Sequence, residues 1–134
     1  MTRRIYLAGA IWGVKDPFTW RRDVAVNLPE GWEAVNPLDL GDGIFDENTE
    51  TPEMVVERDF QAIIECRHVL ARIDMPSWGT AMEIRFAKEK EVPVFGWTVG
   101  NQRPVGPWLR AHCAVLTHDI HIIFEHLRGL HAEG

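Results

Sequence analysis

The sequence predicts an α/β fold in which a doubly wound, flavodoxin-like parallel sheet of about five strands carries helices on both faces. Three observations lead to this prediction. The chain has 134 residues, 46% of them are hydrophobic, and strand-like and helix-like apolar patterns alternate along it. That length fits one compact domain, so residues 1–134 are expected to form a single domain. Alternation is typical of parallel sheets, because parallel neighbours need a crossover connection between them.

Short runs of aliphatic and β-branched residues predict the strands. They cover residues 4–8, 33–35, 68–73, 93–96 and 114–116. Apolar residues that recur with the period of a helix predict the helices. These cover residues 19–28, 54–65, 77–90 and 119–130, and Thr19 and Ser77 are the expected N-caps.

A long connection, residues 36–53, separates the second strand from the second helix and is rich in Asp, Glu, Gly, Asn and Pro. Structureless connections of this length are unusual in a small domain, which favours an active-site loop or a disordered segment. The acids of this connection do not match the ligand spacing of a calcium-binding loop.

The composition argues against several classes of function. The formal net charge is −6 and no stripe of Lys and Arg is present, so binding to a nucleic acid polymer is not expected. No apolar run is long enough to cross a bilayer, and the N-terminus does not resemble a signal peptide. We therefore expect a cytoplasmic protein without a membrane partner. A single nucleotide is still compatible with the charge, because a helix N-terminus can hold one phosphate.

The cysteines and histidines do not form a convincing metal or redox motif. Cys66 and Cys113 are not part of a C-x-x-C pair and are interpreted as idle thiols in a reducing compartment. His118, His121 and His126 fall in one helix-like segment, but other zinc-type ligands are absent nearby. We interpret them as a solvated helix face and expect no metal site.

Two carboxylates stand out on the predicted helices. Asp59 is four residues from both Val55 and Ile63, inside an apolar stripe, where an acid is costly unless it is paired or used. Glu83 lies near the start of its helix, where the helix dipole favours an ionised carboxylate. The alternatives are an Asp59 that bonds a neighbouring loop and a solvated Glu83 that pairs with a nearby basic residue.

Asp74 follows the third predicted strand, at the edge where ligands bind in parallel sheets. A carboxylate there can accept hydrogen bonds from hydroxyl groups of a ligand. The alternative is an Asp that only shapes the turn before Pro76.

Three segments together resemble the nucleoside 2-deoxyribosyltransferase family, and their order and separation also agree. The segments are Arg4-Ile5-Tyr6-Leu7-Ala8-Gly9-Ala10-Ile11-Trp12, Val56-Glu57-Arg58-Asp59 and Pro76-Ser77-Trp78-Gly79-Thr80-Ala81-Met82-Glu83-Ile84. The resemblance covers roughly residues 4–116. It implies an enzyme that acts on a small nucleoside or nucleotide, assembles as a dimer or larger homo-oligomer, and needs no metal or organic cofactor.

The resemblance also implies roles for individual residues. Glu83 matches the nucleophile, Tyr6 matches a tyrosine whose hydroxyl orients that carboxylate, and Asp59 matches an acid that assists departure of the base. Residues in the segment that holds the sugar and its 5′ end are Asp74, Ser77 and Gly79. Residues where the family lines the base pocket are Gly9, Ala10 and Trp12. Trp12 would stack on the base or, as the alternative, pack in the core.

These roles fit the chemistry of an N-glycosidic bond. Cleavage builds positive charge at C1′ and negative charge on the base. A carboxylate beneath C1′ stabilises that positive charge and can trap it covalently, and an acid near the base can protonate it. Water or another base then resolves the intermediate.

The sequence departs from typical transferases of the family at Ser77. They carry an acid two residues before the glycine that matches Gly79. A Ser-x-Gly-x-x-x-Glu pattern is more similar to the family's nucleoside 5′-monophosphate N-glycosidase branch, in which the serine binds phosphate. Ser77 is otherwise only an N-cap. Deoxyribosyl transfer is the leading hypothesis, nucleotide hydrolysis is a close competitor, and a non-catalytic nucleotide-binding module is the alternative of another class.

A second departure concerns the segment from residue 101 to residue 109. The family often completes its pocket there with a polar side chain from a neighbouring subunit. Asn101, Gln102 and Arg103 are the candidates for that side chain, and Trp108 is a candidate for a subunit contact.

Overall fold

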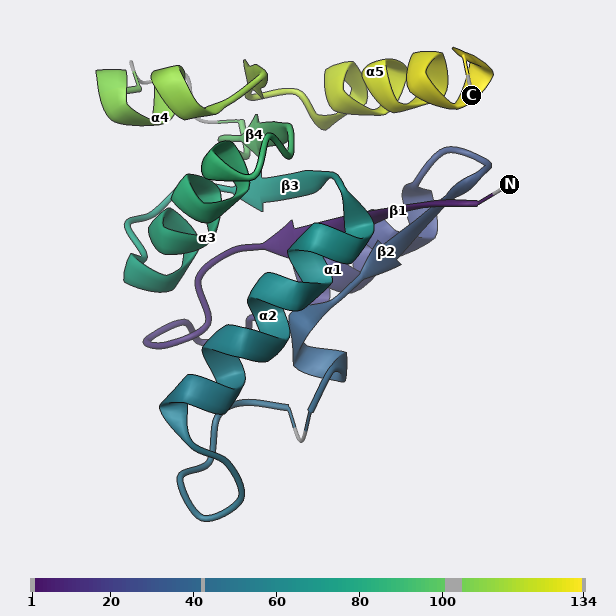
Figure 1. Ribbon diagram of the computed structural model, residues 1–134. Coiled ribbons are helices and arrows are strands. Elements are labelled where there is room, and N and C mark those ends of the chain that lie inside the picture. The colour runs from purple at the N-terminus through teal and green to yellow at the C-terminus, as the bar shows by residue number, and fades with distance from the viewer. Residues whose placement is uncertain (1, 42, 101–104, 134) are drawn as a thin grey trace.

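The computed structural model describes residues 2–41, 43–100 and 105–133. Its centre is one parallel sheet of five strands in the order β2-β1-β3-β4-β5 (Figure 1). The strands are β1 (Arg3–Ala8), β2 (Trp32–Val35), β3 (Val69–Arg72), β4 (Val94–Trp97) and β5 (Val115–Thr117). The predicted doubly wound α/β fold is therefore confirmed, and each predicted strand agrees with an observed one to within two residues at either end.

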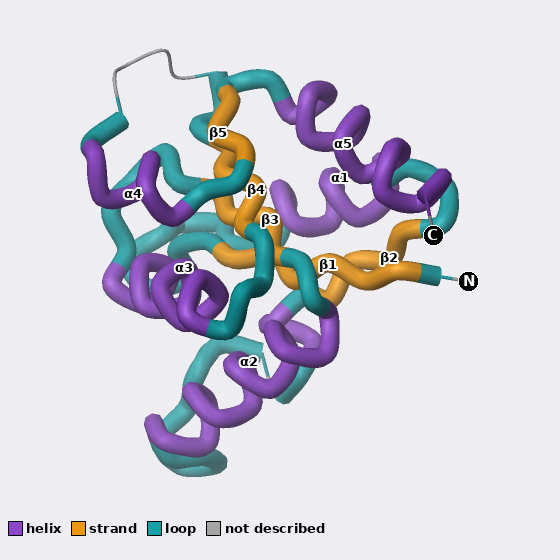
Figure 2. Tube along the Cα trace, turned by 45° about the horizontal axis from the view of Figure 1, so that its top comes forward, coloured by secondary structure: helices purple, strands orange, loops and turns teal. Residues whose placement is uncertain are grey.

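Helices cover both faces of this sheet (Figure 2). They are α1 (Thr19–Asn27), α2 (Pro52–Cys66), α3 (Trp78–Glu89), α4 (Pro107–His112) and α5 (Ile120–Glu133), with a short 3-10 helix η1 (Pro37–Asp39) after β2. Helices α1 and α5 pack on one face of the sheet, and α2 and α3 pack on the other. In the described ranges no helix is both long and apolar enough to cross a membrane.

The alternation of side chains along β1 assigns them to two separate cores. Ile5 and Leu7 pack with α1 and α5, whereas Tyr6 and Ala8 pack with α2 and α3. This follows from the two-residue period of a strand, which sends neighbouring side chains to opposite faces. Tyr6 therefore points toward the two helices that carry Asp59 and Glu83.

The sheet places a binding edge between β1 and β3. These strands are neighbours, with Ala8 opposite Ala71, but the chain leaves β1 toward β2 and leaves β3 toward β4. Such a reversal of strand order opens a crevice at the carboxyl ends of the strands, where ligands bind in open α/β sheets.

Several helix ends differ from the sequence prediction. Thr19 is not the N-cap of α1, because Phe18 has that position and the Asp16 carboxylate accepts bonds from the backbone N–H groups of Phe18 and Thr19. Helix α2 begins two residues early, because Thr51 caps it and Pro52 occupies its first turn. Ser77 caps α3 as predicted.

Helix α4 and the 3-10 helix were not predicted. Each starts with a proline, Pro107 or Pro37, whose fixed φ suits the first helical position. Both helices are too short to show a periodic apolar pattern. The predicted stripe of α2 is also narrower than expected, because Val56 and Ile64 are exposed while Ile63 is fully buried.

The cysteines are at least half-buried and the three histidines are exposed, but His118 precedes α5 instead of lying in the helix with His121 and His126 as predicted. Cys66 is buried and Cys113 is half-buried in the core under α2 and α3. Burial raises the pKa of each thiol to about 11, so both stay protonated at neutral pH. His118, His121 and His126 are exposed. Among the described residues, no three His, Cys, Asp or Glu side chains are grouped to hold a metal ion.

A pair of glycine substitutions tests the packing of the sheet. A Cβ on buried Gly96 would lie 2.8 Å from Leu116 Cδ1 and 3.0 Å from Cys113 Sγ, so Gly96→Ala overpacks the core. We expect it to lower the free energy of unfolding by about 1–3 kcal/mol in a denaturant titration. Gly129 is exposed in α5 with no neighbour near its Cβ position, so Gly129→Ala should raise stability by about 0.5–1 kcal/mol. Equal effects of the two changes would contradict the packing described here.

Candidate active site

A cavity of about 360 Å³ lies at the carboxyl end of β1, between the first turns of α3 and the middle of α2. Tyr6, Asp59 and Glu83 all line it. These three residues are separated by dozens of positions in the sequence, and the fold brings them to one cavity. The convergence of Asp59 and Glu83 expected from the sequence is therefore present.

The Tyr6 hydroxyl donates a short hydrogen bond to Oε2 of Glu83. Tyr6 is fully buried, so its hydroxyl cannot exchange this acceptor for bulk water. Glu83 sits in the second turn of α3 and does not pair with Arg85, which bonds Glu89 instead. The alternative of an ordinary solvated Glu83 is thus wrong.

Burial dominates the electrostatics of this cavity. It raises the pKa of Glu83 from 4.5 to about 8, with the nearby Asp59 acting in the same direction and the Tyr6 hydrogen bond acting against it. Burial also raises the pKa of Asp59, although the neighbouring Arg58 guanidinium opposes that change. The pKa of Tyr6 is raised far above its usual range, first by burial and then by Glu83, so the phenol remains a hydrogen-bond donor.

Arg21 contributes a buried positive charge that sequence reasoning missed. It is 1% exposed and donates to backbone carbonyl oxygens through Nη1 to Pro17 at 2.8 Å and Nη2 to Gly9 at 2.9 Å. Burial lowers the pKa of Arg21 to about 10, and Glu83 is the strongest group that raises it. The guanidinium therefore holds the end of β1 in place and partly offsets the acidic charge in the cavity.

A helical pattern in the sequence could have revealed Arg21. Trp20 and Val24 are buried on the same side of α1, and Arg21 is three residues before Val24. An arginine on an apolar stripe is costly to bury unless its donors are used, which is the same argument that identified Asp59.

Asp59 is held by a neighbouring cation. Its Oδ1 lies 3.4 Å from Nε of Arg58, and its side chain is 16% exposed. The same guanidinium bonds Glu50 through Nη1 at 2.7 Å. Asp59 thus lines the cavity and pairs with Arg58 of its own helix, whereas the alternative expected a bond to a neighbouring loop.

The first turn of α3 offers polar groups to the cavity. Ser77 accepts a hydrogen bond from the Thr80 backbone N–H at 3.3 Å, which leaves its own O–H free to donate. Among the described residues, no acceptor takes the backbone N–H groups of Trp78 and Gly79. Nothing lies within 4 Å of a Cβ built on Gly79, so a ligand can approach the backbone there. Thr80 adds a buried hydroxyl oxygen without a partner.

The residues predicted for the base pocket divide into three cases. Gly9 lines the cavity, and a Cβ on it would lie 2.6 Å from the Trp20 ring, so glycine is required by packing. Trp12 lines the cavity and is 71% exposed, so it is not a core residue, although its ring also packs against Phe45. Ala10 follows Gly9 in the chain but is not among the lining residues.

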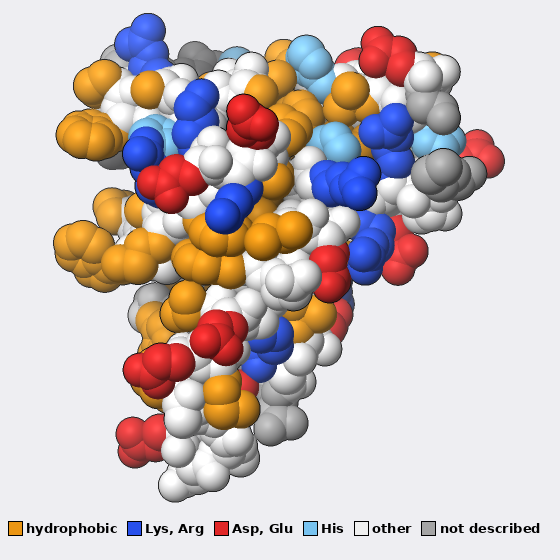
Figure 3. All heavy atoms as spheres, in the orientation of Figure 1, with side chains coloured by type: hydrophobic (Ala, Val, Ile, Leu, Met, Phe, Trp, Pro, Cys, Tyr) orange, Lys and Arg blue, Asp and Glu red, His pale blue; other side chains and the backbone are white. Residues whose placement is uncertain are grey.

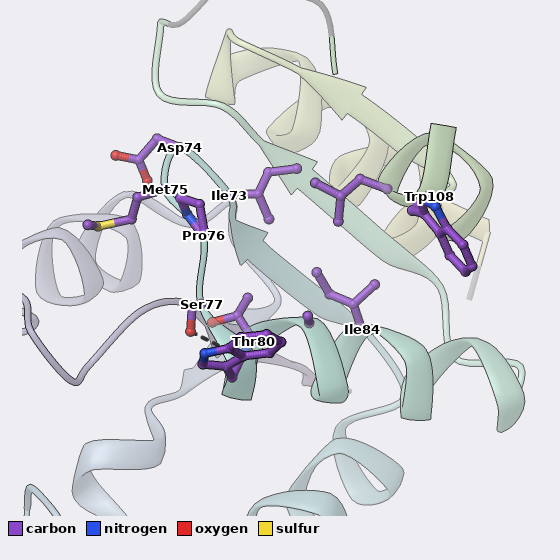
Figure 4. Close-up of a pocket in the computed structure, with 11 residues that line it drawn as sticks. Ile73, Asp74, Met75, Pro76, Ser77, Thr80, Ile84 and Trp108 are labelled. Atoms are coloured by element: carbon purple, nitrogen blue, oxygen red, sulfur yellow. Dashed lines mark hydrogen bonds between the residues drawn. The ribbon is translucent and has the colours of Figure 1, made fainter. Parts of the chain in front are cut away.

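Asp74 lies in a different position from Glu83. It lines a second cavity of about 550 Å³ (Figure 4), which shares Pro76, Ser77, Trp78 and Thr80 with the first. Its carboxylate is held by Arg72, with Nε to Oδ1 at 3.0 Å and Nη2 to Oδ2 at 3.1 Å. Asp74 therefore has a structural partner at the end of β3, and the structure does not bring it to the cavity with Glu83.

The long connection predicted as an active-site loop does line the cavity, through Gly43, Ile44 and Phe45. The ring of Phe45 meets Trp12 edge-on, with centroids 6.2 Å apart. Sequence analysis did not single out these residues, since nothing in their local pattern indicates which loop residues turn inward. The candidates Asn101, Gln102 and Arg103 lie outside the described residues.

The pH dependence of stability tests the raised pKa of Glu83. Ionisation of Glu83 destabilises the folded state. The stability that the neutral Glu83 contributes is therefore fully present below the unfolded pKa of 4.5 and is lost as pH rises through about 8. Glu83→Gln does not titrate, and its stability relative to wild type should rise between these values by on the order of 3 kcal/mol. Urea titrations at a series of pH values measure this, with exposed Glu89→Gln as control. A stability difference that is constant across this range would contradict the raised pKa.

Three solved structures with the same fold, two from bacteria and one from a protozoan, are similar to this chain. A conserved protein from Enterococcus faecalis V583 is 18% identical, with a TM-score of 0.62 over 92% of this chain and 85% of that one. The 2-desoxiribosyltransferase from Leishmania mexicana is 16% identical, with a TM-score of 0.60 over 76% and 67%. The CMP N-glycosidase BcmB from Clostridium botulinum is 21% identical, with a TM-score of 0.63 over 94% and 98%.

The family is shown by the sequence rather than by these distant structures. No curated protein sequence matches the chain. The family model for nucleoside 2-deoxyribosyltransferase matches residues 5–123, which include β1 from Ile5 onward, α2, α3 and every residue that lines the cavity described above. The chain therefore belongs to the nucleoside 2-deoxyribosyltransferase family, a family of enzymes that act on nucleosides and nucleotides.

Proposed function

We propose that this enzyme cleaves the N-glycosidic bond of a (deoxy)nucleoside through a covalent glycosyl–Glu83 intermediate and transfers the sugar to another base. One observation carries the proposal: the buried Tyr6 hydroxyl bonds Glu83 in a cavity that Asp59 also lines. A nucleophile, a group that orients it and an acid for the leaving base are the parts that this reaction needs.

The geometry suggests how the first step proceeds. The Tyr6 hydroxyl donates its hydrogen bond to Oε2 of Glu83, so Oε1 is the oxygen that attacks C1′. A bond forms between Oε1 and C1′ as the C1′–N bond breaks, and its electron pair moves onto the base. Asp59 donates a proton or a hydrogen bond to that nitrogen, and its raised pKa favours this role.

The second step reverses the first with a different base. The incoming base attacks C1′ with a ring nitrogen, the Glu83 carboxylate leaves, and Asp59 accepts the proton that the base loses. Tyr6 and Arg21 both lower the pKa of Glu83 and so stabilise the carboxylate as it is released. Trp12 and Phe45 offer aromatic surface on which each base can stack.

Hydrolysis of a nucleoside 5′-monophosphate is the second candidate, and the start of α3 favours it. Ser77 has a free O–H, and the N–H groups of Trp78 and Gly79 have no acceptor among the described residues. This is the arrangement by which helix N-termini hold phosphate. The chain shares its fold with a CMP N-glycosidase over nearly the whole length of both chains, which supports the same candidate.

A binding module without catalysis is a weaker alternative. Such a module gains nothing from two acids with raised pKa values in one cavity, because each is costly to bury. If no nucleoside or nucleotide of a broad panel released its free base, that result would favour this alternative.

A homo-oligomer, dimer or larger, is also part of the proposal. Trp78, Met82 and Trp108 are 87%, 61% and 81% exposed, and hydrophobic side chains gather on the side of the molecule formed by α3 and α4 (Figure 3). Large apolar groups beside a cavity are typical of a subunit contact. Sedimentation velocity measures the assembly state, and a monomer at micromolar concentration would contradict it.

Removing the nucleophile tests the leading proposal. Glu83→Ala should reduce base release and base exchange by at least about 1000-fold, because it removes the proposed group that traps C1′. Chromatography of the free base measures the rate. The matched control is Glu89→Ala, an exposed glutamate on the same helix that pairs only with Arg85. If Glu83→Ala remained as active as this control, Glu83 would not be the nucleophile.

Comparing a nucleoside with its 5′-monophosphate separates the two reactions. Ser77→Asp preserves the cap of α3 but repels phosphate, so helix stability is not a confounding factor. If the enzyme is a nucleotide hydrolase, this change should lower kcat/KM for the monophosphate by about 100-fold, the effect of losing charge-assisted bonds, and spare the nucleoside. For a transferase, the wild-type enzyme should show no preference for the monophosphate, and base exchange should continue in Ser77→Asp.

A further inference from the structure

The connection between β2 and α2 forms one wall of the cavity through Gly43, Ile44 and Phe45. Most of its charged residues are exposed, and Asp46 bonds only its own loop neighbours. Glu50 is the exception, because its side chain is only 7% exposed and lies against α2. Glu50 is therefore one point at which this wall attaches to the body of the protein.

Arg58 of α2 is that contact. Its Nη1 lies 2.7 Å from Oε1 of Glu50, and its Nε lies 3.4 Å from Oδ1 of Asp59. One guanidinium thus bonds an acid of the cavity wall and the acid proposed to serve the leaving base. Among the described residues, Arg58 is the ion-pair partner of both acids.

The connection touches Arg58 at a second point. A Cβ built on Gly41 would lie 2.2 Å from Nη1 of Arg58 and 3.0 Å from its Cζ. The guanidinium therefore packs directly on the backbone at Gly41, which only glycine permits without displacing Arg58. The connection meets Arg58 on both sides of the wall residues, at Gly41 and at Glu50.

We propose that Arg58 is a positioning residue that clamps the β2–α2 connection to Asp59, so that the base-pocket wall and the leaving-group acid are placed together. Its effect on catalysis rests on the proposed function, but the clamp itself does not. Lysine cannot replace it fully, because its single ammonium cannot bond both acids and pack flat on the backbone at Gly41.

Hydrogen exchange tests the clamp without a substrate. Arg58→Gln and Glu50→Ala should each speed amide exchange in peptides from the β2–α2 connection by at least about 10-fold, because the buried partner loses its counter-charge. Gly41→Ala should do so to a smaller extent, and Arg58→Lys should fall between wild type and Arg58→Gln. Glu47→Ala is the control, since Glu47 is an exposed acid of the same connection. Glu50→Ala keeps the test valid if Arg58→Gln fails to fold.

Kinetics tests the positioning of Asp59. The probes are the nucleoside that the wild-type enzyme cleaves fastest and 7-methyl-2′-deoxyguanosine, whose cationic base leaves without an acid. Arg58→Gln should lower kcat for the first by about 100-fold, as misplaced catalytic groups do, and spare kcat for the second. KM should rise for both, because the pocket wall is released. A merely structural role would lower both kcat values alike.

The outcomes separate this proposal from the proposed function. Exchange and kinetics of Arg58→Gln that match those of Arg128→Gln, an exposed arginine on α5, would overturn the clamp. Faster exchange with equal loss of kcat on both probes would overturn the positioning of Asp59. If the wild-type enzyme releases no base while Arg58→Gln still loosens the connection, the proposed function fails and the clamp stands.

Discussion

The hydrogen bond from the buried Tyr6 hydroxyl to Glu83 is the interaction on which the rest of the site depends. It joins the interior strand β1 to α3, two elements that the parallel sheet brings together at the carboxyl end of its strands. The bond fixes one carboxylate oxygen of a residue that lines the cavity. Every other group at the site, including Asp59 and the start of α3, is arranged around that fixed carboxylate.

The charge balance of the cavity follows from burial. Ionised Asp59 disfavours ionisation of the nearby Glu83, and burial raises the pKa of both acids. Two acids that interact in this way titrate as a pair. Once one of them is ionised, its negative charge makes it harder for the other to lose its proton. Arg21 and Arg58 limit the effect without cancelling it, since each also bonds other acceptors. The proposed reaction starts from the state in which Glu83 is the carboxylate and Asp59 holds the proton, and Tyr6 and Arg21 favour that state by lowering the pKa of Glu83.

The sequence could predict the parts of this protein that local patterns encode. Apolar periodicity located the strands and the longer helices, and Asp59 stood out because an acid interrupted an apolar stripe. What could not be predicted depends on contacts between distant segments. The bond between Tyr6 and Glu83 and the inward turn of Phe45 follow from tertiary packing, and no spacing in the sequence indicates them. The Arg72–Asp74 pair is local, but an Asp after a strand has the same sequence pattern whether it faces a ligand or a neighbouring arginine. Helix α4 was missed because six residues are too few for a period.

Trapping the intermediate tests the central claim most directly. A 2′-fluoro-2′-deoxynucleoside slows both steps of such a reaction, because fluorine destabilises positive charge at C1′. After incubation with this analogue, we predict that intact-protein mass spectrometry shows one added fluorodeoxyribosyl group and that peptide fragmentation places it on Glu83. Release of the base without any adduct, or an adduct on a residue other than Glu83, would contradict the account.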